Sequence, residues 1–321
     1  MLKGFEIVKA IDVNESLLKY REKGALRGKY LGFENLEEYY TMALPGCTDW
    51  TGFPGSGKSE FLLECLLNTS LFYSWKHLIY VPDVGDREEI LAILIHKITG
   101  KTFDKRYQSN YISELEVNRE LDWVLEHFKI LVKTEIKAKI TPYELWDFAV
   151  EYSDSVQGGI QTVTVDSWKD LKHGVSYDGQ TFQRDDKYLE DVLSYRNAIS
   201  EKYKMHLHTV IHPTKTEADK DGKRRAPGPY DLKGGSEWYN NGKTMITVHR
   251  VAGTANEVDI MITKAKPKSV AKVGKVRMFF DIAKAKFYFM HNQERFYASK
   301  QKRNLLGVDL GSSDENDDIP F

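Results

Sequence analysis

The chain has 321 residues, of which 41% are hydrophobic, 12% aromatic and 29% charged. Its 46 lysines and arginines nearly balance 47 aspartates and glutamates, so the formal net charge is −1. This ordinary globular composition excludes collagen-like, disulfide-scaffold and wholly disordered chains. The length suits one large α/β domain with appended segments.

Membrane and secretory signals are not found in the sequence. No apolar run approaches the ~20 residues that span a bilayer, and the first residues lack the layout of a secretory signal. Cys47 and Cys65 lie in apolar surroundings without metal-like spacing, which indicates buried free thiols. We therefore expect a cytoplasmic protein with no membrane partner, in the bacterial host cytoplasm if a phage encodes it.

The chain divides into three predicted parts. Residues 1–28 predict a short helix between Asn14, a candidate N-cap, and Gly24, a candidate stop. Such a helix must pack on the body or on a neighbouring subunit to cover its apolar side. The body is expected over residues 29–292. Residues 293–321, basic and then acidic, predict a disordered tail.

Strand and helix patterns alternate along the body. The expected strands are Cys47–Thr51, His77–Val81, Lys129–Val132, Thr162–Asp166, His206–His212, Thr244–His249, Val258–Thr263, Lys275–Phe280 and Lys286–Met290. The expected helices are Lys58–Asn68, Arg87–Ile98, Glu114–His127, Pro142–Tyr152 and Lys187–Tyr203. This order predicts an α/β domain with a mostly parallel central sheet and an antiparallel, β-rich C-terminal edge.

The strongest motif is a phosphate-binding loop. Its residues are Gly52, Phe53, Pro54, Gly55, Ser56, Gly57, Lys58 and Ser59, and Glu60 follows in the predicted helix. The glycines allow backbone N–H groups to surround phosphates at a helix N-terminus. Lys58 is expected to reach the β- and γ-phosphates, and the Ser59 hydroxyl to ligate Mg²⁺. The motif thus predicts a nucleotide site, with ATP and Mg²⁺ as cofactors.

Acidic residues at strand ends are candidates for the rest of this site. Asp166 ends a β-branched strand and is expected to hold Mg²⁺ through water. Asp83 follows another strand and is a candidate to orient the attacking water, with Asp86 and Glu60 as alternatives. A turn-forming aspartate is an equally open interpretation of Asp83.

A histidine and a basic loop come next. His212 ends a strand, where it could sense the γ-phosphate or simply be a satisfied edge histidine. The long loop after it could bind single-stranded nucleic acid or be a solvated surface loop. Its basic residues are Lys215, Lys220, Lys223, Arg224, Arg225 and Lys233.

These motifs together resemble the RecA-like ATPase domain of DnaB-type replicative helicases, the group that includes phage helicases and Twinkle. The resemblance covers about residues 28–292 and is closest to the phage-type members. The segments that carry it are 32–40, Thr51–Phe61, Val165–Leu171, Val210–Lys215, Gly234–Asn240, Ile246–Arg250 and the strand that ends at Lys264.

The resemblance implies further roles and two departures. Lys58, Ser59 and Asp166 match the nucleotide motifs, and His212 matches a γ-phosphate-sensing position. The loops after Asp166 and His212 match those that grip single-stranded DNA inside a hexamer, and residues 14–24 match a helix that docks on the next subunit. The family's catalytic Glu is replaced by Asp83. Its Lys-x-Arg pair, which contacts the neighbour's nucleotide, is Lys264 and Lys266 here, unless Arg250 takes that part.

The tail resembles the end of bacterial single-stranded-DNA-binding proteins. Its matching residues are Asp317, Asp318, Ile319, Pro320 and Phe321. That similarity implies docking to a replication partner such as a polymerase or primase, or onto the protein's own basic surface.

The sequence therefore predicts an ATP-hydrolysing DNA helicase or translocase, forming a hexameric ring on single-stranded DNA. Its expected catalytic residues are Lys58, Asp83, Asp166, His212, Lys264 and Lys266. Two alternatives stay open: a RecA-like recombinase or mediator that uses ATP as a switch, and a non-catalytic recruitment factor bound to DNA.

Overall fold

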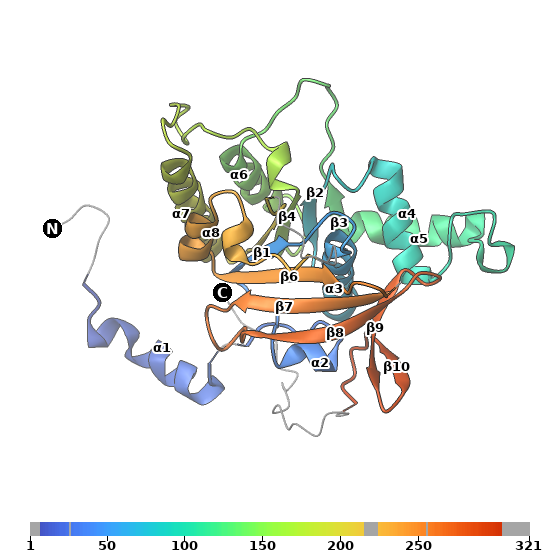
Figure 1. The fold of residues 1–321 in the computed structure, drawn as a ribbon. Coiled ribbons are helices and arrows are strands. Elements are labelled where there is room, and N and C mark those ends of the chain that lie inside the picture. Colours follow the sequence, from blue (N-terminus) through green and yellow to red (C-terminus); the bar gives the residue numbers. More distant parts are fainter. Residues whose placement is uncertain (1–6, 26, 215–223, 255, 304–321) are drawn as a thin grey trace.

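The computed structural model describes residues 7–25, 27–214, 224–254 and 256–303 (Figure 1). Its helices are α1 (Ala10–Lys23), α2 (Glu34–Glu37), α3 (Lys58–Tyr73), α4 (Arg87–Thr99), α5 (Glu114–His127), α6 (Pro142–Ser153), α7 (Asp185–Tyr203) and α8 (Gly235–Asn241). Short 3₁₀ turns are η1 (Gln108–Asn110), η2 (Trp168–Asp170) and η3 (Pro229–Asp231). The strands are β1 (Gly46–Thr51), β2 (His77–Tyr80), β3 (Phe128–Ile130), β4 (Thr162–Asp166), β5 (His206–Ile211), β6 (Thr244–Arg250), β7 (Glu257–Lys264), β8 (Gly274–Asp281), β9 (Lys286–His291) and β10 (Glu294–Tyr297).

All ten strands form one sheet in the order β10-β9-β8-β7-β6-β1-β5-β4-β2-β3. The strands from β6 to β3 pair in parallel, and those from β6 to β10 pair antiparallel. The expected α/β fold with an antiparallel C-terminal edge is confirmed. Parallel strands bring their carboxyl ends to one edge of the sheet, where ligands bind in open α/β folds.

Helices pack against both faces of the sheet because successive strand residues point to opposite faces. On one face α3 and α4 pack against residues such as Trp50, Ile79 and Val210. On the other face α6 and α7 pack against Leu78 and Leu207, among others. Both faces of the parallel part are therefore buried, as its continuous apolar strands predict.

Local signals set where several helices begin. Asp86 caps α4, with its side chain accepting from the Glu89 N–H at 2.9 Å while Glu89 accepts from the Asp86 N–H at 3.0 Å. Thr141 and Glu144 form the same reciprocal cap at α6. Such capping boxes satisfy N–H groups that have no partner inside the helix.

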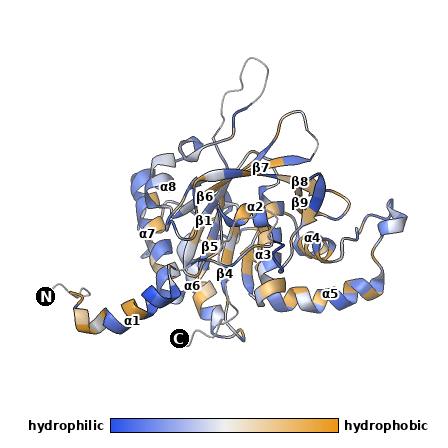
Figure 2. Ribbon diagram, turned by 90° about the horizontal axis from the view of Figure 1, so that it is seen from below, coloured by the Kyte–Doolittle hydropathy of each residue, from blue (hydrophilic) through white to orange (hydrophobic). Residues whose placement is uncertain are grey.

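The first helix differs from its prediction. α1 begins at Ala10, so Asn14 lies inside the helix and the predicted N-cap is wrong. The stop is confirmed, since Gly24 follows the helix with φ of +76°. α1 stands apart from the sheet in both views (Figures 1 and 2), and Leu17 and Leu18 are exposed. Figure 2 shows hydrophobic and hydrophilic residues mixed along it.

The sheet also extends further than predicted. β10 pairs with β9 over Glu294–Tyr297, beyond the expected end of the body at 292. No helix in the described ranges is long and apolar enough to cross a membrane.

Candidate nucleotide site

Four neighbouring strands carry the predicted site residues at their carboxyl ends. The phosphate-binding loop follows β1, Asp83 lies beyond β2, Asp166 ends β4 and His212 follows β5. These strands are adjacent and parallel in the sheet. The structure thus brings together four segments that are far apart in the sequence.

Glycine is required at particular points of the loop. A Cβ atom on Gly52 would lie 2.3 Å from the carbonyl oxygen of Val248, which only the absence of a side chain avoids. Gly55 and Gly57 have φ of +74° and +90°, in the left-handed region that favours glycine. Gly57 immediately precedes α3, so the first N–H groups of that helix face the loop. This geometry can cradle an anionic phosphate at a helix N-terminus.

Two polar side chains of the loop are buried. Lys58 is only 7% exposed, and burial lowers its pKa while Asp166 and Asp83 oppose that change. The buried Ser56 hydroxyl has no hydrogen-bond partner among the described residues. A buried polar atom without a partner is costly, and a phosphate oxygen would satisfy it.

Ser59 and Asp166 form the second part of the site. The Ser59 hydroxyl donates a short hydrogen bond to a carboxylate oxygen of Asp166. Asp166 is 2% exposed, and burial raises its pKa although Ser59 and Lys58 oppose this. The pair supplies oxygen atoms, the donors that Mg²⁺ prefers. No cluster of three or more His, Cys, Asp or Glu side chains able to hold a metal occurs within the described residues.

Asp83 accepts from three donors on two other segments. Its Oδ2 lies 2.8 Å from Lys169 Nζ, 3.0 Å from Ser167 Oγ and 3.0 Å from His212 Nε2. Burial raises the pKa of Asp83, but the bonds from Lys169, His212 and Ser167 outweigh it and lower the pKa to about 2. Asp83 therefore stays ionised at neutral pH. It joins the segment after β4 to the segment after β5.

The two alternative carboxylates lie elsewhere. Asp86 caps α4, as described above. Glu60 pairs with the fully buried Lys97 at 2.8 Å. Lys97 also lies 3.5 Å from Glu64 and donates to the Ala285 carbonyl at 2.7 Å. Asp83 alone of the three candidates contacts His212.

The basic loop reaches the nucleotide site at its described end. The Arg224 guanidinium lies over the ring of Phe53, 5.6 Å from its centroid, so the loop contacts the phosphate-binding loop directly. Arg225 instead pairs with Asp231 at 2.6 Å, and Lys233 pairs with Asp185 at 3.0 Å. Lys215, Lys220 and Lys223 lie outside the described residues, as do Asp317, Asp318, Ile319, Pro320 and Phe321 of the tail.

The predicted neighbour-contacting lysines lie at the opposite edge of the sheet. Lys264 pairs in register with Met245, near the amino end of β6, whereas the phosphate-binding loop follows the carboxyl end of β1. Lys264 is buried, with Nζ 4.7 Å from the Tyr239 ring centroid, and burial together with Lys266 lowers its pKa to about 8. Lys266 is exposed. Arg250 ends β6 at the same edge as the loop.

Sequence reasoning missed two members of this site, Ser167 and Lys169. Ser167 and Lys169 directly follow Asp166, so the extended motif after β4 was the available signal. Their contact with Asp83 depends on the pairing of β2 with β4, which no local pattern specifies.

The fold and the loop define a RecA-like P-loop domain. No protein-family model matches the chain. It is 24% identical over 269 residues to the "Twinkle homolog protein, chloroplastic/mitochondrial" of Arabidopsis thaliana. The aligned region covers 81% of this chain and 36% of that protein. The chain therefore spans little more than a third of the length of this curated relative.

Two solved structures share the fold. One is an ATPase domain that superimposes with a TM-score of 0.70 at 14% identity, covering 88% of this chain and 99% of that one. The other is a DnaB-like replicative helicase, solved in work on its interactions with primase. It superimposes with a TM-score of 0.68 at 14% identity, covering 88% of this chain and 67% of that one. The predicted resemblance to DnaB-like replicative helicases is confirmed; the resemblance of the tail stays a prediction.

Proposed function

We propose that this chain is the motor of an ATP-dependent DNA helicase or translocase that works on single-stranded DNA. The observation that carries the proposal is the position of Asp83 beside the phosphate-binding loop. One carboxylate there holds Lys169 and His212, which begin the two segments expected to contact DNA. A change at the γ-phosphate can therefore alter both segments through one group. A protein that only binds DNA would not require one carboxylate to connect its nucleotide site to both DNA-contacting segments.

ATP and Mg²⁺ are the cofactors that these residues fit. The glycines of the loop and the unsatisfied Ser56 hydroxyl would accommodate phosphates. Lys58 belongs to the same loop, and its side chain is buried, so its charge is partly desolvated. Ser59 and Asp166 would hold Mg²⁺, which neutralises phosphate charge when bound. His212 Nδ1 has no partner among the described residues, while Nε2 contacts Asp83. His212 is thus placed to transmit a change at the site to the loop that follows.

The first test is steady-state ATP hydrolysis with and without single-stranded DNA, at low and moderate salt, alongside Lys58→Ala. We expect DNA to stimulate turnover, the stimulation to weaken with salt, and Lys58→Ala to abolish it. Strand displacement on a forked duplex then separates unwinding from translocation. Full hydrolysis by Lys58→Ala would contradict the proposal. DNA binding without stimulated turnover would favour an ATP-switched recombinase or a recruitment factor.

The second part of the proposal is assembly into a ring of identical subunits, with six as the expected number. Leu17 and Leu18 of α1 are exposed, and the helix stands apart from the sheet in both views (Figures 1 and 2). Lys264 and Lys266 lie toward the edge of the sheet opposite the loop of their own chain, as expected for groups that serve a neighbour. A head-to-tail contact that closes on itself forms a ring, and one that does not close forms a filament.

Substitution of the α1 leucines tests this assembly. Leu17→Asp with Leu18→Asp should convert the oligomer to monomers, measured by light scattering after size-exclusion chromatography. The matched control is Leu115→Asp, on the exposed side of α5, which should leave the mass unchanged. Closed rings in electron micrographs of the parent protein would support the helicase, and helical filaments on DNA would contradict it. An oligomer that survives the double substitution would exclude α1 as the contact.

A further inference from the structure

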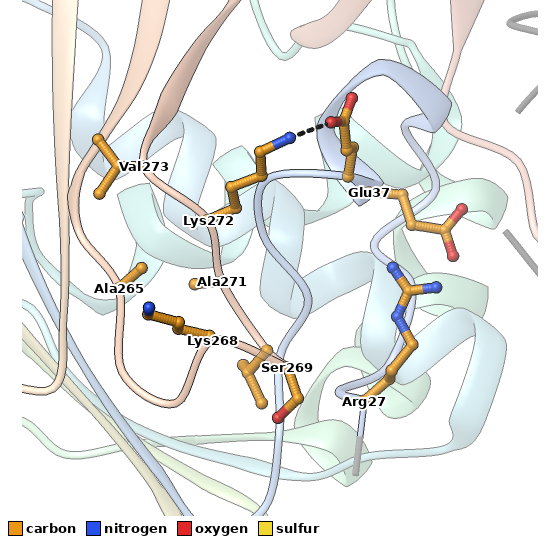
Figure 3. Close-up of a pocket in the computed structure, with 10 residues that line it drawn as sticks. Arg27, Glu37, Ala265, Lys268, Ser269, Ala271, Lys272 and Val273 are labelled. Carbon is orange, nitrogen blue, oxygen red and sulfur yellow. Dashed lines mark hydrogen bonds and ion pairs between the residues drawn. The ribbon is translucent and has the colours of Figure 1, made fainter. Parts of the chain in front are cut away.

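A cavity of about 530 Å³ lies between the segment after α1, helix α2 and the loop between β7 and β8. Its volume is within the ~300–1,000 Å³ typical of ligand pockets. Figure 3 shows Ala265, Ala271 and Val273 along one side and Arg27 and Glu37 along the other. The cavity therefore combines an apolar wall with a charged rim.

Positive charge predominates at this rim. Arg27, Lys268 and Lys272 line the cavity together with Glu37 and Glu38. Both carboxylates are already neutralised, since Lys272 contacts Glu38 at 2.5 Å and Lys302 contacts Glu37 at 2.7 Å. Lys268 has no carboxylate partner within the described part of the chain. The cavity is thus suited to an acidic segment that also carries apolar side chains.

The described chain ends at the rim of this cavity. Lys302 holds Glu37, and the Arg303 N–H donates to Glu34 at 2.6 Å, so two consecutive residues fasten the chain to α2. Residues 304–321 begin at that point. They contain no lysine or arginine, and their acids are Asp309, Asp314, Glu315, Asp317 and Asp318. Their last three residues, Ile319, Pro320 and Phe321, are apolar.

We propose that residues 304–321 dock in this cavity within the same chain. The apolar end of the segment would contact Ala265, Ala271 and Val273, and its acids would face Lys268 and Lys272. Eighteen residues span up to ~60 Å when extended, so reach is not limiting. Because the segment is tethered at the rim, its effective concentration there is on the order of millimolar, and weak contacts suffice.

Photo-crosslinking in the full chain tests the docking without using ATP hydrolysis. p-Benzoylphenylalanine at position 321 keeps the aromatic ring, and mass spectrometry maps the products. We expect crosslinks to residues 265–273 inside one chain, with a yield that does not change on dilution. Crosslinks only to other regions, or products that join two chains, would overturn the proposal.

Charge-reversed variants provide the matched comparison. Lys268→Glu with Lys272→Glu should reduce the yield about tenfold, because both substitutions place negative charge opposite the acids of the segment. Lys105→Glu with Lys137→Glu, at exposed positions elsewhere, should leave the yield unchanged. Asp317→Lys with Asp318→Lys should restore crosslinking in the first variant. Equal yields in all of these proteins would also overturn the proposal, and thermal unfolding of each confirms that it is folded.

Discussion

Asp83 has the charge state of a group that orients water and not that of one that accepts a proton. A general base works best when its pKa lies near the working pH. The donors Lys169, His212 and Ser167 lower the pKa of Asp83 to about 2 although burial opposes them. Its carboxylate is then fully ionised but weakly basic. An aspartate is also one methylene shorter than the glutamate that the resemblance to DnaB-type helicases implies at this position, so the three donors matter more for placing its carboxylate.

Asp83→Asn tests this role at the scale of one residue. The variant keeps the shape but loses the charge, so we expect kcat to fall by roughly 10²-fold or more with little change in nucleotide binding. Because Asp83 is ionised above about pH 2, it should contribute no acid limb to the rate of the parent protein between pH 5 and 8. Steady-state ATPase assays between pH 5 and 8 measure both the kcat of the variant and the pH profile of the parent protein.

Asp86→Asn is the matched control. It lies three residues further on, and asparagine caps a helix about as well as aspartate does. Its turnover should equal that of the parent protein. An Asp83→Asn variant with unchanged turnover would mean that another group orients the water.

At the scale of elements, a buried ion cluster joins α3, α4 and β9. Lys97 is fully buried between Glu60 and Glu64, and both Glu64 oxygens accept from the Phe287 N–H at 3.0 and 2.9 Å. Burial raises the pKa of Glu64 to about 7 although Lys97 opposes this. Since α3 begins inside the phosphate-binding loop, the cluster fixes the helix that presents the loop.

Lys97→Met should destabilise the fold strongly, because it leaves a buried carboxylate without its cation. We expect a loss of about 3–5 kcal/mol in unfolding free energy at pH 8, measured by urea denaturation. The loss should be smaller at pH 6, where Glu64 takes up a proton and its buried charge is removed. Lys101→Met, which breaks the surface pair with Glu116, should cost under ~1 kcal/mol. Equal losses for the two variants would contradict this account.

Periodicity in the sequence is sufficient to predict most elements and the edge of the sheet that holds the site. The alternating apolar residues of β4 and the caps of α4 and α6 are local signals, so they can be read directly. Glu60 directly follows the phosphate-binding loop, but its carboxylate pairs with Lys97 on another helix, which no local pattern specifies. Asn14 has the side chain of an N-cap, yet α1 starts earlier. Contacts such as Lys169 with Asp83 depend on strand order, which local patterns do not encode.

At the scale of the whole molecule, three histidines are buried in the parallel part of the sheet, His77 on β2 and His206 and His208 on β5. Burial lowers the pKa of His77 to about 3 and that of His206 to about 4, and it holds the pKa of His208 well below its usual value. His206 contacts Thr48 at 2.8 Å, and His208 accepts from Trp50 at 3.1 Å. All three are therefore neutral in the folded protein.

These histidines predict an acid-sensitive fold. Unfolding returns each pKa to about 6.5, so below that pH the unfolded chain binds more protons and stability falls. The expected loss approaches ~1.4 kcal/mol per pH unit for each histidine, until the folded-state pKa is reached. Urea denaturation at pH 7.5, 6.5 and 5.5 measures it, and calorimetry in two buffers counts the protons taken up. Stability that is flat across this range, without proton uptake, would contradict the prediction.

The central position of β1 also has a consequence for biosynthesis. β1 pairs with β5 and β6. Gly46 therefore cannot pair until His206 has been synthesised, and Thr48 cannot pair with β6 until Thr244 has been synthesised. At ~5–20 residues per second, roughly ten seconds or more pass between the synthesis of these partners. During that interval the apolar side chains of α3 and the strand before it have no sheet to cover them. The nascent chain therefore exposes this apolar surface until β6 leaves the ribosome, and the nucleotide site cannot form before β5 has been made.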